Sequence, residues 1–140
     1  MQSQHHDAGH MAALGREWIA AWNSRELERV LALYADDSEM TSDRIQALGM
    51  DASGTLRGKD RLRTYWGTAL RLLPNLHFDL IDLFVSPNSI VVFYQNERGA
   101  KICEYLRLNA EGKIVQGSAN HLAHQDAYSS VDAPRDASGF

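Results

Sequence analysis

The second half of this 140-residue chain contains four strand-like segments that are separated from one another by only a few residues. Strands with connections this short favour a mostly antiparallel sheet, because adjacent antiparallel strands can be joined by tight turns. The intervening turns carry proline, asparagine and glycine, which favour chain reversal. The segments are LHFDLIDLFV, SIVVFYQNE, AKICEYLRLN and KIVQGSANHLAH, and the turns contain Ser86-Pro87-Asn88, Arg98-Gly99 and Glu111-Gly112.

Helical periodicity precedes these strands. From Met11 to Trp22, apolar residues recur at the spacing of one helix face. The letters NSRE then predict a second helix, with Asn23 as N-cap and Glu26 completing a capping box. A third helix is expected to begin at Lys59 and to end at Pro74. Helices followed by strands predict an α+β fold, with three helices packed on one face of the sheet.

The segment between the second and third helices is harder to interpret. We expect a short strand around Ser38 to Ser42. Residues 44–58, RIQALGMDASGTLRG, have three glycines and little periodicity, which predicts a loop or a flap over a site. The ends of the chain are polar, so we expect a disordered tail over residues 1–10, one domain over 11–124 and a flexible tail over 125–140.

The composition excludes several classes of function. With 44% hydrophobic residues, 23% charged residues and a net charge of −4, the chain resembles an ordinary globular domain and carries no basic stripe for nucleic acid. It has no apolar run of about 18 residues that could cross a membrane. A single cysteine, Cys103, suits the reducing cytoplasm. Metal-binding spacings and glycine-rich phosphate loops are absent, so no cofactor and no metal are expected.

Three stretches carry a resemblance to the NTF2-like superfamily, in the SnoaL-like branch that includes ketosteroid isomerases and polyketide cyclases. They are WIAAWNSRELERVLALYADDSEMTSD, LRGKDRLRTYW and EYLRLNAEGKIVQGSANH. The resemblance covers residues 11–124. It implies an NTF2-like cone, in which a curved sheet wraps around the helices and encloses a pocket for a small hydrophobic ligand. It also implies a homodimer formed through the outer face of the sheet.

Glu104 is the principal candidate for a catalytic residue. On an alternating strand it shares one face with Ile102, Leu106 and Leu108, where an unpaired charge would be costly. Burial would raise its pKa and make it a hydrogen-bond donor at neutral pH. The resemblance places it where ketosteroid isomerases hold a protonated aspartic acid that stabilises the substrate oxyanion. The alternative is that Glu104 bonds a neighbouring Tyr, Trp or Arg and only organises the pocket.

Two other isomerase positions are not matched. The oxyanion-hole tyrosine of the first helix corresponds to Trp18, and the catalytic aspartate of the short strand corresponds to Ser42. Asp43 follows Ser42 and would point to the opposite face of a regular strand. A steroid isomerase that uses the usual base is therefore not expected.

His121 is the second catalytic candidate. It shares a strand face with Gly117 and Ala119, whose small side chains leave space for a ligand. A histidine in that space could exchange protons near neutral pH and act with Glu104 as an acid/base couple. The alternative is a half-buried histidine with a structural role. We expect His77 and His124 to lie on the surface.

Substrate-binding residues are expected among the aromatic and polar side chains around the pocket. Only one of Gln95 and Asn96 can face inward, and we favour Asn96 as an amide that orients the substrate. Asp36 and Asp37 fit a turn better than a carboxylate pair. The candidate lining residues are Trp18, Tyr34, Met40, Ser42, Trp66 and Asn96.

We therefore expect a cofactor-free protein that performs acid/base catalysis on a hydrophobic carbonyl compound, as an isomerase, cyclase or dehydratase does. The alternative is a protein without catalytic activity, either a small-molecule binder or a dimeric scaffold. An enzyme needs Glu104 and His121 close to one ligand position, whereas a binder could lose either. A pure scaffold predicts a filled pocket.

Overall fold

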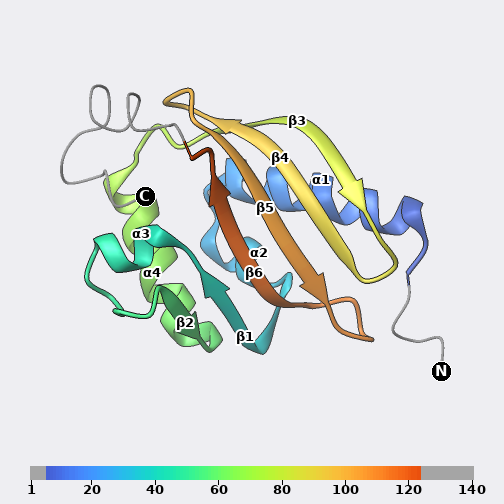
Figure 1. The fold of residues 1–140 in the computed structure, drawn as a ribbon, viewed down its shortest axis with the longest axis horizontal. Coiled ribbons are helices and arrows are strands. Elements are labelled where there is room, and N and C mark those ends of the chain that lie inside the picture. Colours follow the sequence, from blue (N-terminus) through green and yellow to red (C-terminus); the bar gives the residue numbers. More distant parts are fainter. Residues whose placement is uncertain (1–5, 124–140) are drawn as a thin grey trace.

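Six strands form a single curved sheet in the computed structural model, which describes residues 6–123. The strand order is β2-β1-β6-β5-β4-β3, and Figure 1 shows this arrangement. Neighbouring strands are antiparallel except for β1 and β6, which are parallel. The strands are β1 (Tyr34–Thr41), β2 (Thr55–Arg57), β3 (Phe78–Val85), β4 (Ser89–Asn96), β5 (Lys101–Leu108) and β6 (Ile114–His121).

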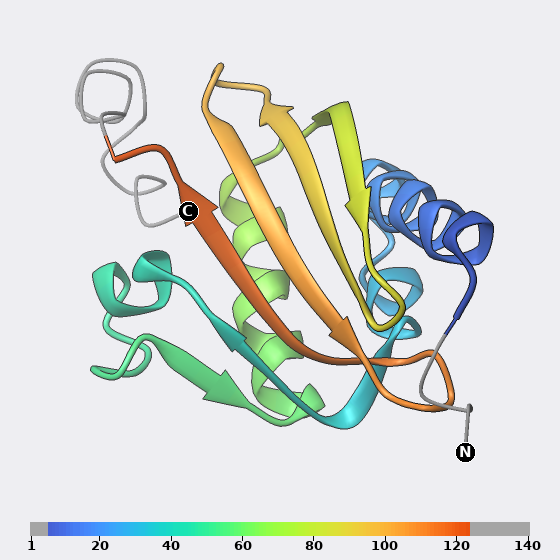
Figure 2. The ribbon, with the colours of Figure 1, turned by 45° about the vertical axis from the view of Figure 1, so that its right-hand side comes forward.

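The two long helices lie on the same face of the sheet, as Figure 2 shows. Helix α1 packs against β3 and β4, and helix α4 packs against β1 and β2. The hydrophobic core fills the space between these helices and the sheet. The helices are α1 (Ala8–Ser24), α2 (Leu27–Leu31), α3 (Asp43–Ala47) and α4 (Lys59–Leu72).

The expected α+β architecture and its mostly antiparallel sheet are confirmed. Strand β5 alternates as predicted, since Glu104 and the three aliphatic residues that share its face are all buried. Helix α4 begins at Lys59, as expected, and buries one apolar stripe. The buried residues of this stripe are Leu62, Tyr65, Trp66, Ala69 and Leu70.

The predicted capping box is wrong. Helix α1 continues through Ser24 and ends at Arg25, whose φ of 63° is left-handed, so Asn23 lies inside the helix. The Asn23 side chain instead bonds both backbone groups of Phe78. Helix α2 starts at Leu27 without a side-chain cap. A tertiary contact to β3 therefore determines the role of Asn23, and the local pattern does not.

Helix α1 also begins earlier than its periodicity indicated. Asp7 caps it by accepting a hydrogen bond from the backbone N–H of His10, over 2.7 Å. Residues 8–10, which we assigned to the disordered tail, are therefore helical. Because polar and glycine residues dominate this turn, hydrophobic periodicity could not detect it.

Residues 44–58 are not a simple loop. Helix α3 begins directly after Ser42, whose hydroxyl accepts a hydrogen bond from the Arg44 backbone N–H. Strand β2 then pairs with β1, with Met40 opposite Leu56. Strand β1 itself starts at Tyr34, four residues before the expected Ser38. The α3 and β2 elements have five and three residues, which is too short for a clear periodic signal.

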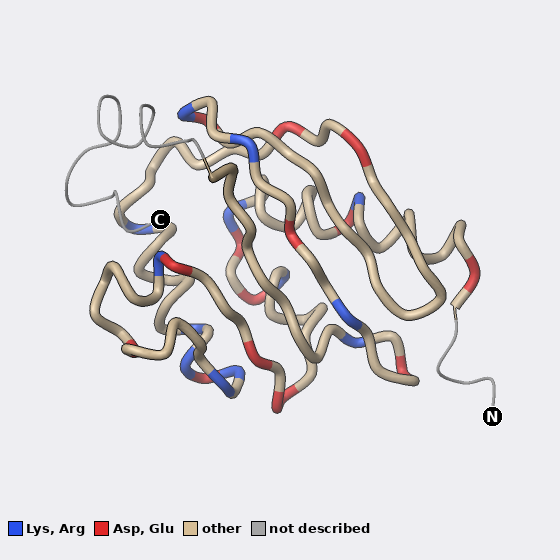
Figure 3. Tube along the Cα trace, in the orientation of Figure 1, with Lys and Arg blue, Asp and Glu red and all other residues tan. Residues whose placement is uncertain are grey.

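Positive and negative residues are interspersed along the described chain, as Figure 3 shows. Between residues 6 and 123, no helix is long and apolar enough to cross a membrane.

Candidate functional site

Glu104 points from β5 toward the helices and is only 3% exposed. The Tyr94 hydroxyl on β4 donates a hydrogen bond to Glu104 Oε1 over 3.1 Å. Burial raises the pKa of Glu104 to about 8, although the hydrogen bond from Tyr94 opposes part of the rise. The carboxyl group is therefore mostly protonated at pH 7. Because Oε1 accepts the hydrogen bond from Tyr94, Oε2 can carry the proton and donate a hydrogen bond to a ligand.

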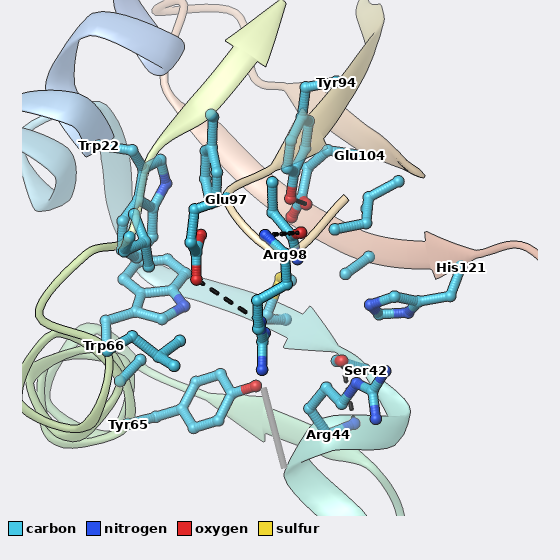
Figure 4. A pocket seen from close by; sticks show the side chains of 18 of the residues that line it. Trp22, Ser42, Arg44, Tyr65, Trp66, Tyr94, Glu97, Arg98, Glu104 and His121 are labelled. Atoms are coloured by element: carbon cyan, nitrogen blue, oxygen red, sulfur yellow. Dashed lines mark hydrogen bonds and ion pairs between the residues drawn. The ribbon is translucent and has the colours of Figure 1, made fainter. Parts of the chain in front are cut away.

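A cavity of about 80 Å³ lies between the sheet and the helices, and Figure 4 shows it from close by. Glu104 forms part of its wall. The scaffold alternative predicted a filled pocket, which this cavity does not match. The cavity brings most of the predicted site residues together: Trp18, Met40, Ser42, Trp66, Asn96, Glu104 and His121 line it.

Tyr34 does not line the cavity but supports its wall from behind. Its hydroxyl accepts a hydrogen bond from Trp18 Nε1 over 3.0 Å, and its ring packs on Trp66 with centroids 4.9 Å apart. Burial, and then the neighbouring Glu104, raise the pKa of Tyr34 well above its ordinary value. Tyr34 therefore stays neutral and fixes the orientation of Trp18.

Aromatic side chains form most of the apolar wall. All three tryptophans of the chain line the cavity. Trp18 stacks on Phe78 with centroids 5.7 Å apart, and Trp22 meets Trp66 edge to face at 5.4 Å. Trp22, Phe78 and Tyr94 were not among the predicted lining residues. Strand alternation could have found Tyr94, since it lies two residues before Asn96 on the same face.

Asn96 faces inward, as we favoured, while Gln95 is only partly buried. The Asn96 side-chain oxygen accepts hydrogen bonds from the backbone N–H groups of Arg98 and Ala100, over 2.9 and 3.0 Å. The amide thus holds the β4–β5 turn closed. This turn carries Arg98, so Asn96 also positions that side chain at the cavity.

His121 lines the cavity from the end of β6, and its Nδ1 lies 3.5 Å from Asp43 Oδ1. We expected Asp43 to point away from the site, as on a regular strand. The chain instead leaves β1 at Thr41, and Asp43 is the first residue of α3, which brings its carboxylate to His121. His77, by contrast, is exposed and contacts Asp79, as we expected of a surface histidine. His124 lies outside the described residues.

The pKa of His121 is lowered, mainly because the ring is buried. The second-largest effect is the positive charge of Arg44, which also lowers the pKa of His121. The negative charge of Asp43 raises this pKa, and Arg98 lowers it by a smaller amount. The imidazole is therefore neutral at pH 7 and able to accept a proton. His121, Arg44 and Arg98 form the more exposed end of the cavity, which we call the mouth.

Arg44 and Arg98 were not predicted as site residues. Arg44 lies in the segment that we expected to be a loop, and Arg98 lies in a turn. The serine N-cap before Arg44 was a local signal for α3. No local signal shows that these two arginines meet at one cavity. Among residues 6–123, no group of three or more His, Cys, Asp or Glu side chains could hold a metal ion.

A curved sheet with helices on one face and a pocket between them is the architecture of the NTF2-like superfamily. The family model of the SnoaL-like domain matches residues 15–117. This chain belongs to the SnoaL-like family, which confirms the resemblance that its sequence indicated. No curated protein matches it significantly.

Solved structures agree with this assignment. A SnoaL-like protein of unknown function from Burkholderia thailandensis is 32% identical, with a TM-score of 0.81 over 85% of this chain and 99% of that one. A SnoaL-like protein from Agrobacterium tumefaciens, proposed to be an isomerase, is 16% identical, with a TM-score of 0.64 over 82% and 99%. A protein from Sinorhizobium meliloti, proposed to be a polyketide cyclase, is 9% identical, with a TM-score of 0.64 over 82% and 100%. The last two show the fold alone.

Proposed function

We propose that this protein catalyses proton transfer on a small hydrophobic carbonyl compound without a cofactor, as in isomerisation, cyclisation or dehydration. The observation that carries the proposal is the chemistry of one cavity. It combines a buried, protonated carboxyl group, Glu104, with a neutral histidine, His121. Groups whose pKa values are shifted to opposite sides of their usual values suit acid and base roles at neutral pH.

Glu104 acts as the hydrogen-bond donor to the substrate carbonyl oxygen. When a proton leaves the carbon next to the carbonyl group, negative charge develops on that oxygen. The Oε2–H group of Glu104 stabilises this enolate, and Tyr94 holds the carboxyl group by donating to Oε1. The aromatic wall limits the water that could compete for the same hydrogen bond.

His121 acts as the base that removes the proton. Strand pairing places Glu104 opposite Ala119 and Ile102 opposite His121, so the two catalytic groups are diagonal neighbours on one face. The Cα atoms of such neighbours are roughly 7–8 Å apart, and both side chains line the same cavity, so one small substrate can contact both groups. Asp43 orients the imidazole through its contact with Nδ1.

Exchange of substrate hydrogen for deuterium tests this proposal directly. In D₂O, the protein should accelerate exchange at the carbon next to the carbonyl in at least one member of a panel of steroid, polyketide and terpenoid ketones, followed by proton NMR. His121→Gln should lower kcat by about 100-fold, since a positioned base contributes about that much or more. His77→Gln, which changes an exposed histidine outside the cavity, is the matched control and should leave the rate unchanged.

The same panel separates catalysis from the alternative of binding alone. A ketone that raises the melting temperature of the protein but exchanges no faster than in buffer would favour a binder. Glu104→Leu adds a further criterion. If the leucine variant is more stable yet loses the ligand-induced rise, Glu104 is retained for ligand recognition at a cost in stability. If it is strongly destabilised and no ligand affects either protein, Glu104 is a structural residue.

A further inference from the structure

Trp22 presents a buried hydrogen-bond donor that no other group of the described chain uses. Its side chain lines the cavity, and the residue is only 5% exposed. Within residues 6–123, the indole Nε1 of Trp22 has no hydrogen-bond partner. Trp18, one helical turn earlier on α1, differs in this respect, because its Nε1 donates to the Tyr34 hydroxyl over 3.0 Å. Of two neighbouring indoles, the described part of the fold therefore supplies a partner for only one.

The Trp22 ring is fixed in its orientation by its surroundings. It meets Trp66 edge to face with centroids 5.4 Å apart, and it packs against Phe78 at 5.8 Å. The next residue, Asn23, ties this end of α1 to β3 through its two hydrogen bonds with Phe78. Figure 4 shows Trp22 and Trp66 on one side of the pocket and His121 on the other, with the Trp22 nitrogen on the side of its ring that is turned toward the other lining residues. The donor is therefore preorganised before a ligand enters.

The unpartnered indole N–H lowers the stability of the protein, because burial removes its hydrogen bonds to water and gives none in return. An oxygen atom of a ligand at this position would supply the missing bond. The aromatic rings around Trp22 make a charged oxygen unsuitable, since an anion loses its hydration among apolar groups. The position therefore suits a neutral acceptor, which is the oxygen of a hydroxyl, ether or carbonyl group.

The second donor of the cavity is the protonated carboxyl group of Glu104, which Tyr94 holds through a hydrogen bond. The Phe78 ring links the two donors, since its centroid lies 5.8 Å from that of Trp22 and 4.3 Å from that of Tyr94. A ligand can therefore reach both donors with two oxygens that are a few bonds apart. The cavity of about 80 Å³ favours a short aliphatic chain, because a dry cavity of roughly 150 Å³ is the size that accommodates benzene.

We propose that the substrate carries a second, neutral oxygen a few bonds from its reacting carbonyl group, and that Trp22 Nε1 donates a hydrogen bond to this oxygen while Glu104 donates to the carbonyl. Trp22 is then a specificity-determining residue, which favours oxygenated ketones over alkyl ketones of the same shape. This inference names the substrate class of the proposed proton-transfer site and rests on that proposal only for the contact with Glu104.

Isosteric pairs of ketones test the inference. In 4-hydroxybutan-2-one and pentan-2-one, a hydroxyl group replaces a methyl group. In 4-methoxybutan-2-one and hexan-2-one, an ether oxygen replaces a methylene group, and 5-methoxypentan-2-one and heptan-2-one repeat the ether pair with one more carbon between the oxygens. NMR of the ¹⁵N-labelled protein follows the indole N–H signals of the three tryptophans during titration with each ketone.

In the wild-type protein, the oxygenated member of at least one pair should move the Trp22 indole proton downfield, as hydrogen-bond formation does. Its alkyl partner should cause no downfield shift. The indole signal of Trp18, which is already bonded to Tyr34, is the internal reference. The same titrations should show that the oxygenated ketone binds about threefold or more tightly than its alkyl partner, since a neutral hydrogen bond contributes about that much.

Two matched variants locate the donor. Trp22→Phe removes the N–H group and should abolish the preference for oxygen, because the ligand oxygen then leaves water without gaining a bond. Trp66→Phe makes the same change in the neighbouring ring of the wall and should weaken both members of a pair alike, so that the preference stays. Binding of the alkyl ketone shows that each variant is folded. If a variant does not fold, the downfield shift in the wild-type protein decides alone.

The possible outcomes separate this inference from the proposed function. If oxygenated ketones bind through Trp22 but exchange no deuterium, the inference holds and the catalytic proposal fails. If no oxygenated ketone moves the Trp22 signal downfield, the inference is overturned, and rapid deuterium exchange of the alkyl ketones would still support the catalytic proposal. Loss of the oxygen preference in Trp66→Phe, with the preference retained in Trp22→Phe, would also overturn the inference.

Discussion

Glu104 is a carboxyl group whose pKa in the folded protein, about 8, lies above its ordinary value of 4.5. Between these two values the folded state binds more protons than the unfolded state, so the stabilising effect is complete below pH 4.5 and is lost as pH rises toward 8. Glu104→Gln keeps the shape of the protonated acid but cannot ionise. We therefore expect the wild-type protein to lose stability relative to Glu104→Gln as the pH rises.

The measurement is urea denaturation of both proteins from pH 4.5 to 8.5. The difference in their free energies of unfolding should change by up to about 1.4 kcal/mol per pH unit within that window. Titration of His121 is common to both proteins and cancels in the difference. A difference that stays constant with pH would show that Glu104 has an ordinary pKa and is not held in its neutral form.

His121 offers a second prediction, since three neighbouring charges act on one ring. Asp43→Asn removes the charge that raises the pKa of His121, so this pKa should fall further below its usual value. Arg44→Gln removes a charge that lowers the pKa and should raise it. NMR titration of the imidazole signals measures both shifts, with His77 as an internal reference. Shifts in the same direction for both variants would contradict the assigned contacts.

The inward orientation of Glu104 and of Asn96 could be predicted from the sequence because strand alternation is a local rule. The pairing of His121 with Asp43 could not, because it depends on where β1 ends and α3 begins. Arg44 and Arg98 were missed for a related reason. Their convergence is produced by tertiary packing, which no spacing along the chain records.

Among the elements, the contact between α1 and β3 depends strongly on one side chain. Asn23 donates to the carbonyl oxygen of Phe78 over 2.9 Å and accepts from its N–H over 2.8 Å. Asn23→Ala leaves both backbone groups without these partners at the start of β3. We expect a loss of about 2 kcal/mol in the free energy of unfolding, at roughly 1 kcal/mol for each bond.

Thermal and urea unfolding measure this loss. Asn120→Ala is the matched control, because Asn120 is exposed and, within residues 6–123, its side chain bonds only groups on β5 and β6. It should change stability by no more than about 0.5 kcal/mol. Equal effects of the two substitutions would show that the link between α1 and β3 is not held by Asn23.

Long elements were predicted better than short ones. Helix α4 and strands β4 and β5 carry regular periodic patterns, and the limits of these elements, and of β3 and β6, lie close to the expected residues. Helix α3 is stabilised by its serine N-cap, and strand β2 is stabilised by pairing with β1. Hydrophobic periodicity records neither effect. The capping-box pattern at Asn23 was misleading because the same amide can satisfy a neighbouring strand.

At the scale of the whole molecule, the sheet has a second face, turned away from the helices. Apolar side chains form a strip over β3, β4 and β5 on this face, because strand pairing sets Phe84 beside Val91, Val91 beside Tyr105, and Phe93 beside Cys103. Phe84 at its edge is 56% exposed. The family resemblance implies a homodimer through this outer face, and we propose that this strip is its centre.

Burial of these side chains against a second copy would stabilise the dimer by the hydrophobic effect, so a charge within the strip should oppose association. We expect Tyr105→Glu to weaken the dimer by at least about tenfold, as measured by sedimentation velocity over a range of concentrations. Leu122→Glu is the control, since Leu122 is an exposed apolar residue, 55% accessible, that follows β6 and lies outside the strip. The cavity lies on the opposite face of the sheet, so the monomeric variant should still bind ligand. If the wild-type protein sediments as a monomer at every concentration, this dimer is refuted. If Tyr105→Glu loses ligand binding together with the dimer, the pocket depends on the partner subunit.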